Sequence, residues 1–200
     1  MKTHNPFNKS SFLPAVVALL VFTNTTFAQE KSEAPVFNDN ITMEQITAAQ
    51  KGWGAALIAI SAAYREGGIE KARPLAKTVL ETAYAYQMGP VLFKPTLTVS
   101  PQTFRITEES ALAYFVGHNE KFPNDKGFAL NPWVKYDFEN AAVFISGDTA
   151  QTMGKVYLTN DKGEVTEVDK TWGFKKDSSG NLRIYLHHSS LPYSQPKQEK

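Results

Sequence analysis

The chain has 200 residues, of which 20% are charged, a formal net charge of +1 at pH 7, and no cysteine. Because charge is balanced and lysines and arginines do not cluster along any one segment, the sequence gives no electrostatic support for nucleic-acid binding. A disulfide framework is excluded, so the hydrophobic core alone must hold the fold, and the chain is long enough to form one.

The N-terminus is predicted to be a signal peptide, residues 1–28. Lys2 and Lys9 form a basic start, Phe12–Phe22 is an apolar run too short to span a bilayer, and small residues surround a cleavage position after Ala28. The alternative is an uncleaved membrane anchor, which is disfavoured because no second apolar segment follows. We therefore expect a periplasmic or secreted protein that is free of the membrane after signal cleavage.

The mature chain is predicted to hold a single domain, residues 41–193. Polar segments flank this domain on both sides. Residues 29–40 are therefore expected to be a flexible N-terminal segment, and residues 194–200 a disordered tail.

Two helices are predicted at the start of the domain. Thr42 and Gln45 have the spacing of a capping box, and apolar residues follow at helical spacing as far as Gly67-Gly68, where the first helix is expected to end. The second helix tolerates Pro74 only in its first turn. Gly89-Pro90 is expected to end it.

A short strand and a short helix come next. Residues 91–94 are predicted to form the strand, which Pro95 closes. Thr107 is predicted to cap a third helix that ends at Gly117, with Tyr114 in its last turn. This helix connects the helical half of the chain to its strand-rich half.

The period of the hydrophobic pattern changes from helical to two at Trp133. Five strands are predicted: Trp133–Glu139, Ala141–Ser146, Thr152–Leu158, Val165–Phe174 and Leu182–Ser189. Helices followed by a run of antiparallel strands predict an α+β fold, in which a long helix packs across a curved sheet and leaves a concavity.

The last strand is predicted to form the wall of a polar pocket, because it ends in His187, His188, Ser189 and Ser190. Neighbouring side chains on a strand point to opposite faces. His187 and Ser189 are therefore expected on one face, together with Arg183 and Tyr185. His188 and Ser190 are expected on the other face, together with Leu182, Ile184 and Leu186.

Several motifs in one collinear order resemble the iota-class carbonic anhydrases. The motifs are Tyr84-Ala85-Tyr86, Val91-Leu92-Phe93-Lys94-Pro95-Thr96, Phe104-Arg105-Ile106-Thr107, Tyr114-Phe115-Val116-Gly117, Asp125-Lys126-Gly127-Phe128-Ala129, Met153-Gly154 and His187-His188-Ser189-Ser190-Leu191-Pro192. That class is related to the association domain of calcium/calmodulin-dependent kinase II and to the SnoaL-like, nuclear-transport-factor-2-like superfamily. The resemblance covers nearly all of the mature chain.

The resemblance implies a cone-shaped α+β barrel, a homodimer, and the reversible hydration of carbon dioxide to bicarbonate without a metal. In the family a Thr, a Tyr and a Ser hold bicarbonate by hydrogen bonds. By position in the motifs these correspond to Thr96, Tyr114 and Ser189. Hydroxyl groups suit that role because each can donate or accept a hydrogen bond.

Further candidates surround these three hydroxyls. His187 is placed beside them by strand geometry, and its unperturbed pKa of about 6.5 suits export of the released proton. Ser190 would replace Ser189 if the strand register slipped by one residue. Phe93 is expected to supply apolar wall, and Arg105 to bind an anion or to pair with Glu108 or Glu109.

No cofactor is expected. Catalytic zinc usually has three protein ligands, and the mature chain offers only His118, His187 and His188 as histidines. The last two point to opposite sides of a strand, so both would reach one ion only at a bulge. A metal therefore stays the weaker alternative.

Two other functions remain open from the sequence. The chain could be a non-enzymatic module that oligomerises and binds ligands, as the kinase association domain does. It could also be a SnoaL-like isomerase or cyclase, which needs a carboxylate base inside the cone. Asp137 and Asp169 are the strand acids that could serve as that base.

Overall fold

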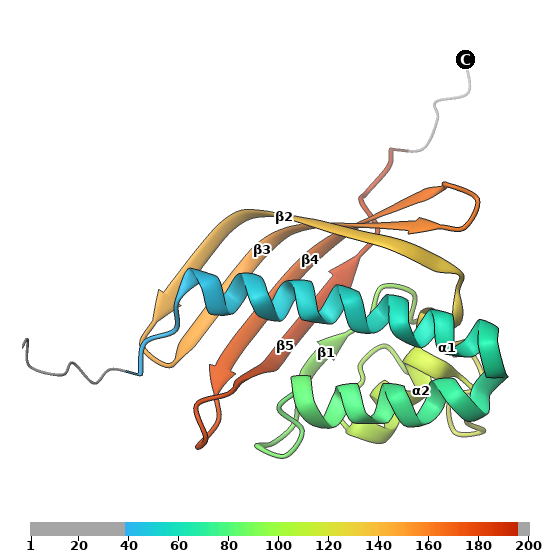
Figure 1. The fold of residues 1–200 in the computed structure, drawn as a ribbon, viewed down its shortest axis with the longest axis horizontal. Helices are drawn as coiled ribbons and strands as arrows, with labels where there is room; N and C mark the ends of the chain where they lie inside the picture. The colour runs from blue at the N-terminus through green and yellow to red at the C-terminus, as the bar shows by residue number, and fades with distance from the viewer. Residues whose placement is uncertain (1–38, 196–200) are drawn as a thin grey trace, which may run out of the picture. The chain divides into compact units, whose positions relative to one another are not determined.

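The computed structural model describes residues 39–195 (Figure 1). The predicted signal peptide, most of the predicted flexible segment and the last five residues of the predicted tail lie outside the described residues. Within the described part, no helix is both long and apolar enough to cross a membrane.

The long helix α1 (Met43–Ala83) has two arms that meet at Gly67 and Gly68. Gly68 has a φ of 65°, a left-handed conformation that glycine adopts without strain, so the predicted break at this position is confirmed. The chain reverses there, and the second arm runs back beside the first (Figure 1). Pro74 lies inside the second arm rather than in its first turn.

Both ends of α1 have a local cause. At the start, the predicted capping box is present, with Thr42 Oγ1 accepting from the Gln45 amide and the Gln45 side chain accepting from the Thr42 amide. At the other end, the helix stops at Ala83, earlier than the predicted Gly89-Pro90. Tyr84 is extended and bridges to Ile184 in the last strand, so sheet pairing ends the helix.

A five-stranded mixed sheet makes up the rest of the fold, in the order β1-β5-β4-β3-β2. The strands are β1 (Leu92–Lys94), β2 (Trp133–Ser146), β3 (Thr149–Asn160), β4 (Val165–Lys176) and β5 (Leu182–Ser190). The short helix α2 (Glu108–Val116) and the 3-10 helix η1 (Phe128–Leu130) lie between β1 and β2 in the chain. Thr107 caps α2, as predicted.

The sheet is antiparallel except where β1 pairs in parallel with β5. The predicted α+β arrangement of a long helix against a curved sheet is confirmed, but the sheet has two edges, β1 and β2, and is not closed into a barrel (Figure 1). The predicted strands 133–139 and 141–146 are one strand, β2, with a bulge between Asn140 and Ala142.

The first arm of α1 packs across one face of the sheet (Figure 1). Gln50 is buried there, and its amide exchanges hydrogen bonds with Asn140 at 2.8 and 2.9 Å and donates to Thr152 at 3.3 Å. Four residues along the helix, Gly54 leaves room for the ring of Tyr136 on β2. Polar and steric matching therefore fix the register of the helix on the sheet.

A register shift in β5 changes which side chains face the core. Gly173 pairs with Leu186 and Phe174 pairs with Ile184, so Tyr185 is left without a partner in the ladder. As a result Ile184, His187 and Ser189 are all buried. The predicted strict alternation, which put Ile184 on the face opposite His187, is wrong because it assumed an unbroken strand.

Candidate functional site

The end of β5 delivers two polar side chains to the interior. His187 and Ser189 are buried, whereas His188 is exposed and lines a surface depression together with Ser190 and Asp169. The prediction that His187 and Ser189 share a face is confirmed. The alternative in which Ser190 enters the pocket is wrong, because Ser190 lies on the outer face of the sheet.

Thr96 lies directly beside Ser189. Because β1 pairs in parallel with β5, with Lys94 opposite His188, the chain two residues beyond β1 passes next to Ser189. Thr96 Oγ1 donates a hydrogen bond to Ser189 Oγ at 3.0 Å. Lys94 Nζ donates to the Ser189 carbonyl at 2.9 Å and ties the two segments together.

Tyr114 is the third predicted hydroxyl, and it reaches the same place from α2. Its side chain is only 5% exposed, and its hydroxyl has no hydrogen-bond partner within the protein. Burial raises the pKa of Tyr114 far above its ordinary value, while the nearby Thr96 side chain opposes that shift. Since Thr96 touches Ser189 and adjoins Tyr114, the structure brings the three hydroxyls together.

Aromatic rings form the wall behind these hydroxyls. The ring of Phe93, on β1, stacks on the imidazole of His187 at 4.3 Å between centroids and meets Tyr114 edge-on at 5.8 Å. Tyr114 also stacks on Phe128, at 5.5 Å. Phe93 thus lies at the site, as predicted, between two of the candidate polar residues.

A surface pocket lies beside Tyr114. It lies between α2 and the segment that leads into η1, and it is lined by Leu97, Tyr114, Asn124, Asp125, Lys126, Gly127, Phe128 and Asn131. Thr96 and Ser189 do not line it. The pocket therefore borders the Tyr114 side chain, whose hydroxyl itself is buried.

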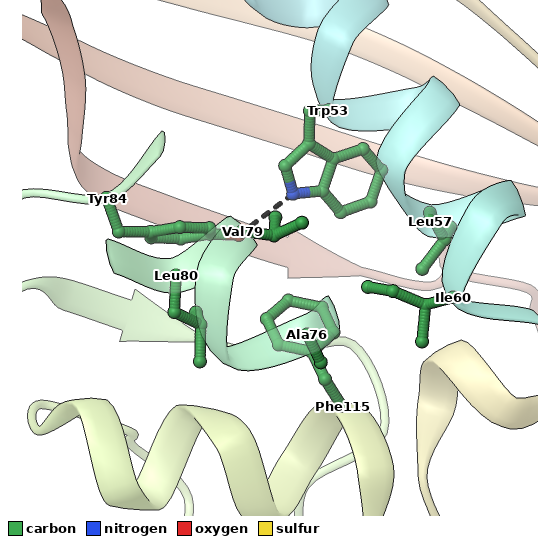
Figure 2. Close-up of a pocket in the computed structure, with 8 residues that line it drawn as sticks. All are labelled: Trp53, Leu57, Ile60, Ala76, Val79, Leu80, Tyr84 and Phe115. Atoms are coloured by element: carbon green, nitrogen blue, oxygen red, sulfur yellow. Dashed lines mark hydrogen bonds between the residues drawn. The ribbon is translucent and has the colours of Figure 1, made fainter. Parts of the chain in front are cut away.

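His187 is held by a hydrogen-bond chain that starts on α1. The Trp53 indole donates to the Tyr84 hydroxyl at 2.8 Å, and that hydroxyl lies 2.8 Å from His187 Nδ1. Figure 2 shows the first of these bonds at the end of a small apolar pocket between the two arms of α1 and Phe115 on α2. Tyr84 thus links helix, pocket and strand.

The other imidazole nitrogen contacts a buried lysine. His187 Nε2 lies 2.5 Å from Lys170 Nζ, and Lys170 packs between the rings of Trp53 and Trp172. Burial lowers the pKa of Lys170 well below its ordinary value, and burial also lowers the pKa of His187.

These contacts change the predicted role of His187. Its side chain is 1% exposed and both ring nitrogens are occupied. The assumption of an unperturbed pKa near neutrality is wrong, because desolvation disfavours the imidazolium. His187 therefore cannot by itself hand a proton to solvent near pH 7.

Lys170 and Tyr84 were not singled out from the sequence, although a signal for Lys170 was present. In β4 the apolar residues Val168, Trp172 and Phe174 recur at every second position, and Lys170 falls in the same register. A lysine in phase with buried apolar residues predicts an inward-facing amine. For Tyr84 the sequence offers only its place in a motif.

Arg105 has a structural role. Its guanidinium grips both carboxylate oxygens of Asp125, with Nη2 at 2.8 Å from each, and donates to the carbonyls of Gln102 and Phe104. The predicted pairing with Glu108 or Glu109 is wrong; Asp125 is the partner. Because its donors are committed to these groups, the alternative of anion binding by Arg105 is also not supported.

The described residues do not offer a metal site. Between residues 39 and 195, no three His, Cys, Asp or Glu side chains come together where they could hold an ion. His118 caps the end of α2, with Nδ1 3.0 Å from the Val116 carbonyl. His188 lies on the outer face of β5.

The carboxylates proposed for an isomerase or cyclase lie outside the core. Asp137 is exposed on β2, where it accepts from the amide of Phe138. Asp169 lines the depression on the outer face of the sheet. Neither can act as a base inside the concavity, so that alternative has no support.

Comparison with known proteins agrees with this geometry. A family model described as metal-independent carbonic anhydrase matches residues 44–191. The metal-independent carbonic anhydrase of Nostoc sp. (strain PCC 7120) is 55% identical over 168 residues, which cover 84% of this chain and 82% of that protein. The crystal structure of a cyanobacterial iota-carbonic anhydrase complexed with bicarbonate matches with a TM-score of 0.80 and 56% identity, over 82% of this chain and 100% of that chain.

A more distant structure shares the fold alone. The putative calcium/calmodulin-dependent protein kinase II association domain from Xanthomonas campestris is 18% identical, with a TM-score of 0.50, over 80% of this chain and 95% of that chain. The family match spans most of the described residues and includes every predicted site residue. The chain therefore belongs to the metal-independent carbonic anhydrase family, as the resemblance predicted.

Proposed function

We propose that this chain catalyses the reversible hydration of carbon dioxide to bicarbonate, without a metal, at the hydroxyls of Thr96, Tyr114 and Ser189. Family membership supports the reaction. The bicarbonate complex of the cyanobacterial relative supports the identity of the substrate. The convergence of three hydroxyls from β5, α2 and the segment after β1 supports the position of the site.

The observation that carries this proposal is the buried hydroxyl of Tyr114. It has no partner within the protein, and leaving such a group unpaired costs about 1–3 kcal/mol. A bicarbonate oxygen, or the water that attacks carbon dioxide, would satisfy it. Because its pKa is raised, Tyr114 keeps its hydrogen at neutral pH and acts as a donor.

The chemistry follows from fixed donors in a site with little water. Water adds to the carbon of carbon dioxide, and negative charge develops on the carboxylate oxygens. Hydroxyls that already point at those oxygens stabilise the charge without reorganising, as an oxyanion hole does. The Thr96–Ser189 bond holds two of them in place, and the ring of Phe93 provides an apolar side for the gas.

The direct test is stopped-flow measurement of carbon dioxide hydration on protein stripped with a chelator. Tyr114→Phe, Thr96→Val and Ser189→Ala should each lower kcat by about 100- to 1,000-fold, since each removes one donor. Ser190→Ala is the matched control on the outer face and should leave the rate unchanged. A wild-type rate equal to that of buffer would reject the activity, and a Tyr114→Phe rate equal to wild type would reject the site.

A homodimer is proposed as the working form of the protein. Leu92, Phe104 and Ile106 are more than half exposed and surround a groove with Leu186, which is an unusual concentration of apolar surface. A second copy of the chain would cover it. Sedimentation equilibrium should give a dimer that Phe104→Glu weakens, whereas a larger ring would favour an assembly like that of the kinase association domain.

Export is proposed from the sequence of residues 1–28. A basic start, a short apolar run and small residues before the predicted cleavage position have the order of a signal peptide. Mass spectrometry of the protein from the periplasm of a bacterial host should find a mature chain that begins at Gln29. A chain that retains Met1 in the membrane fraction would contradict export with cleavage.

A further inference from the structure

Lys170 is a buried amine without an anionic partner. It is 5% exposed, and its contacts are the imidazole of His187 and the rings of Trp53 and Trp172, at 4.5 and 5.2 Å. None of the ion pairs formed by residues 39–195 includes it. The desolvation of an isolated buried ammonium costs more free energy than a cation–π contact returns.

The hydrogen-bond chain on the other side of His187 fixes the charge of this amine. The Trp53 indole can only donate, so the Tyr84 oxygen is an acceptor in that bond. Tyr84 is fully buried, and the acceptor left for its own hydrogen is His187 Nδ1. His187 then carries its hydrogen on Nε2, which must donate to Lys170 Nζ. Only an unprotonated amine can accept that bond.

The opposite assignment leaves a buried donor unpaired. If Lys170 were an ammonium, it would donate to Nε2, and the hydrogen on Nδ1 would point at the Tyr84 oxygen. Tyr84 would then accept from both Trp53 and His187, and its hydroxyl hydrogen would have no partner in a fully buried position. Two costs, an unpaired hydroxyl and an unpaired charge, both disfavour this state.

The surrounding ionisable groups do not reverse the conclusion. Tyr84, Tyr86, Tyr114 and Tyr136 are neutral at pH 7 because burial raises the pKa of each. Asp169 and the exposed imidazole of His188 line the depression on the outer face of the sheet, which Lys170 also borders, but Asp169 forms no ion pair with the amine. Burial lowers the pKa of Lys170 itself, in agreement with the hydrogen-bond argument.

Lys170 is also next to the proposed substrate site. It pairs directly with Ser189 across β4 and β5, and both side chains are buried on the same face. Side chains in such a pair have Cβ atoms about 4.5–5.5 Å apart. A neutral amine therefore lies directly across the sheet ladder from Ser189, one of the three hydroxyls of the proposed substrate site.

We propose that Lys170 is an unprotonated amine, held by His187, that receives the proton released when water adds to carbon dioxide at Ser189. This inference rests on the proposed function. One water O–H bond breaks as the new C–O bond forms. The lone pair of Lys170 Nζ, released from its bond with His187 Nε2, takes up the proton, so that the amine becomes an ammonium. Transfer of the proton to buffer then restores the amine.

The charge state can be measured on the wild-type protein, whatever its activity. Nitrogen-15 NMR should find one lysine side chain as an NH2 group at pH 7, close in space to the indole protons of Trp53 and Trp172. It should also find His187 protonated on Nε2. A Lys170 NH3 group at pH 7, or His187 protonated on Nδ1, would overturn the proposal.

Variants then test the transfer. Lys170→Met and Lys170→Arg should lower the rate of carbon dioxide hydration by about 100-fold or more, which is the rate contribution typical of a general base. Added small amines should restore part of that rate to Lys170→Met. Lys155→Met, a lysine on the exposed face of the sheet, is the matched control and should keep the rate and pH profile of the wild type. A folded Lys170→Met with the wild-type rate would overturn the proposal.

The two proposals can fail separately. If the wild-type protein hydrates no carbon dioxide, the proposed function fails and the proton transfer fails with it, although the NMR result still establishes whether the amine is neutral. If the wild type is active and Lys170 is charged, only the inference about Lys170 is overturned.

Discussion

At the scale of single residues, three hydroxyl side chains make up the proposed site. Thr96 and Ser189 already share one hydrogen bond, and Tyr114 adds a donor whose raised pKa keeps it protonated. Arg105 supports this arrangement from outside, because it neutralises Asp125, a carboxylate that lines the same pocket as Tyr114. The proposed substrate contacts and the structural contacts therefore involve different residues.

Removing Arg105 should destabilise the whole domain. Arg105 and Asp125 are only 2% and 5% exposed, and Arg105→Ala leaves the carboxylate buried without a partner. We expect a loss of about 3–5 kcal/mol in the free energy of unfolding, measured by urea denaturation. Lys71→Ala removes an exposed ion pair with Glu66 and should leave the midpoint unchanged. Equal midpoints for the two variants would show that the buried pair is not structural.

At the scale of residues, the sequence predicted the three hydroxyls of the proposed site but not the side-chain contacts that surround them. Thr96, Tyr114 and Ser189 stand in motifs that resemble a known family, so their positions could be transferred. The contacts of Lys170 and Tyr84 with His187 depend on how β4, β5 and α1 pack, and no spacing in the sequence encodes that. The partner of Arg105, Asp125, is twenty residues away and was missed because nearer acids were available.

Close packing of α1 against β2 sets the shape of the concavity at the scale of elements. Gly54 faces the sheet, and a Cβ atom built there would lie 1.9 Å from the ring of Tyr136. Gly52 lies two residues earlier in the same helix, and a Cβ atom built there would have no atom within 4 Å. The two glycines therefore differ only in their surroundings.

Alanine substitutions at these glycines should have opposite effects. Gly52→Ala should raise the free energy of unfolding by up to about 1 kcal/mol, because alanine favours the helix over glycine. Gly54→Ala should lower it, since the ring of Tyr136 or the whole helix arm must move. Thermal unfolding followed by circular dichroism measures both. If Gly54→Ala were as stable as Gly52→Ala, the helix would not pack on the sheet as described.

The sequence predicted the elements well where the pattern is continuous and less well where it is interrupted. The helix caps at Thr42 and Thr107 and the break at Gly67-Gly68 have local signals, so they were predicted. The bulges at Ala141 and Tyr185 arise from pairing between strands. In β2 the bulge made one strand look like two, and Gly154 opposite it permits the close approach of the Glu139 carbonyl.

At the scale of the molecule, the buried bases make stability depend on pH. The folded-state pKa values of Lys170 and His187 are lowered from their ordinary values of 10.5 and 6.5. Below those ordinary values the unfolded chain binds more protons than the folded protein. The contribution of these groups to the free energy of unfolding therefore rises as the pH rises. It falls as the pH is lowered, because each base then takes up a proton on unfolding.

Comparison of the wild type with Lys170→Met isolates this effect. The free energy of unfolding of the wild type, relative to that of the variant, should rise by about 1.4 kcal/mol per pH unit between about pH 7 and pH 10. Denaturant titrations at several pH values provide the measurement. A difference that does not change with pH would mean that Lys170 carries the same charge in the folded and unfolded states.

The overall architecture was predictable only in part. A long helix followed by strands indicated the α+β class, and the order of the elements is as expected. Closure could not be predicted, because it depends on whether the edge strands β1 and β2 meet, and β1 has only three residues. The parallel pairing of β1 with β5, which brings Thr96 to Ser189, is likewise a property of the folded chain.

The most direct test of the hydroxyl site is a crystal structure of the wild-type protein soaked in bicarbonate after treatment with a chelator. We predict density for a planar anion within hydrogen-bond distance of the hydroxyls of Thr96, Tyr114 and Ser189. Bicarbonate bound elsewhere in the molecule, with these three hydroxyls bonded only to one another or to the protein, would contradict the account.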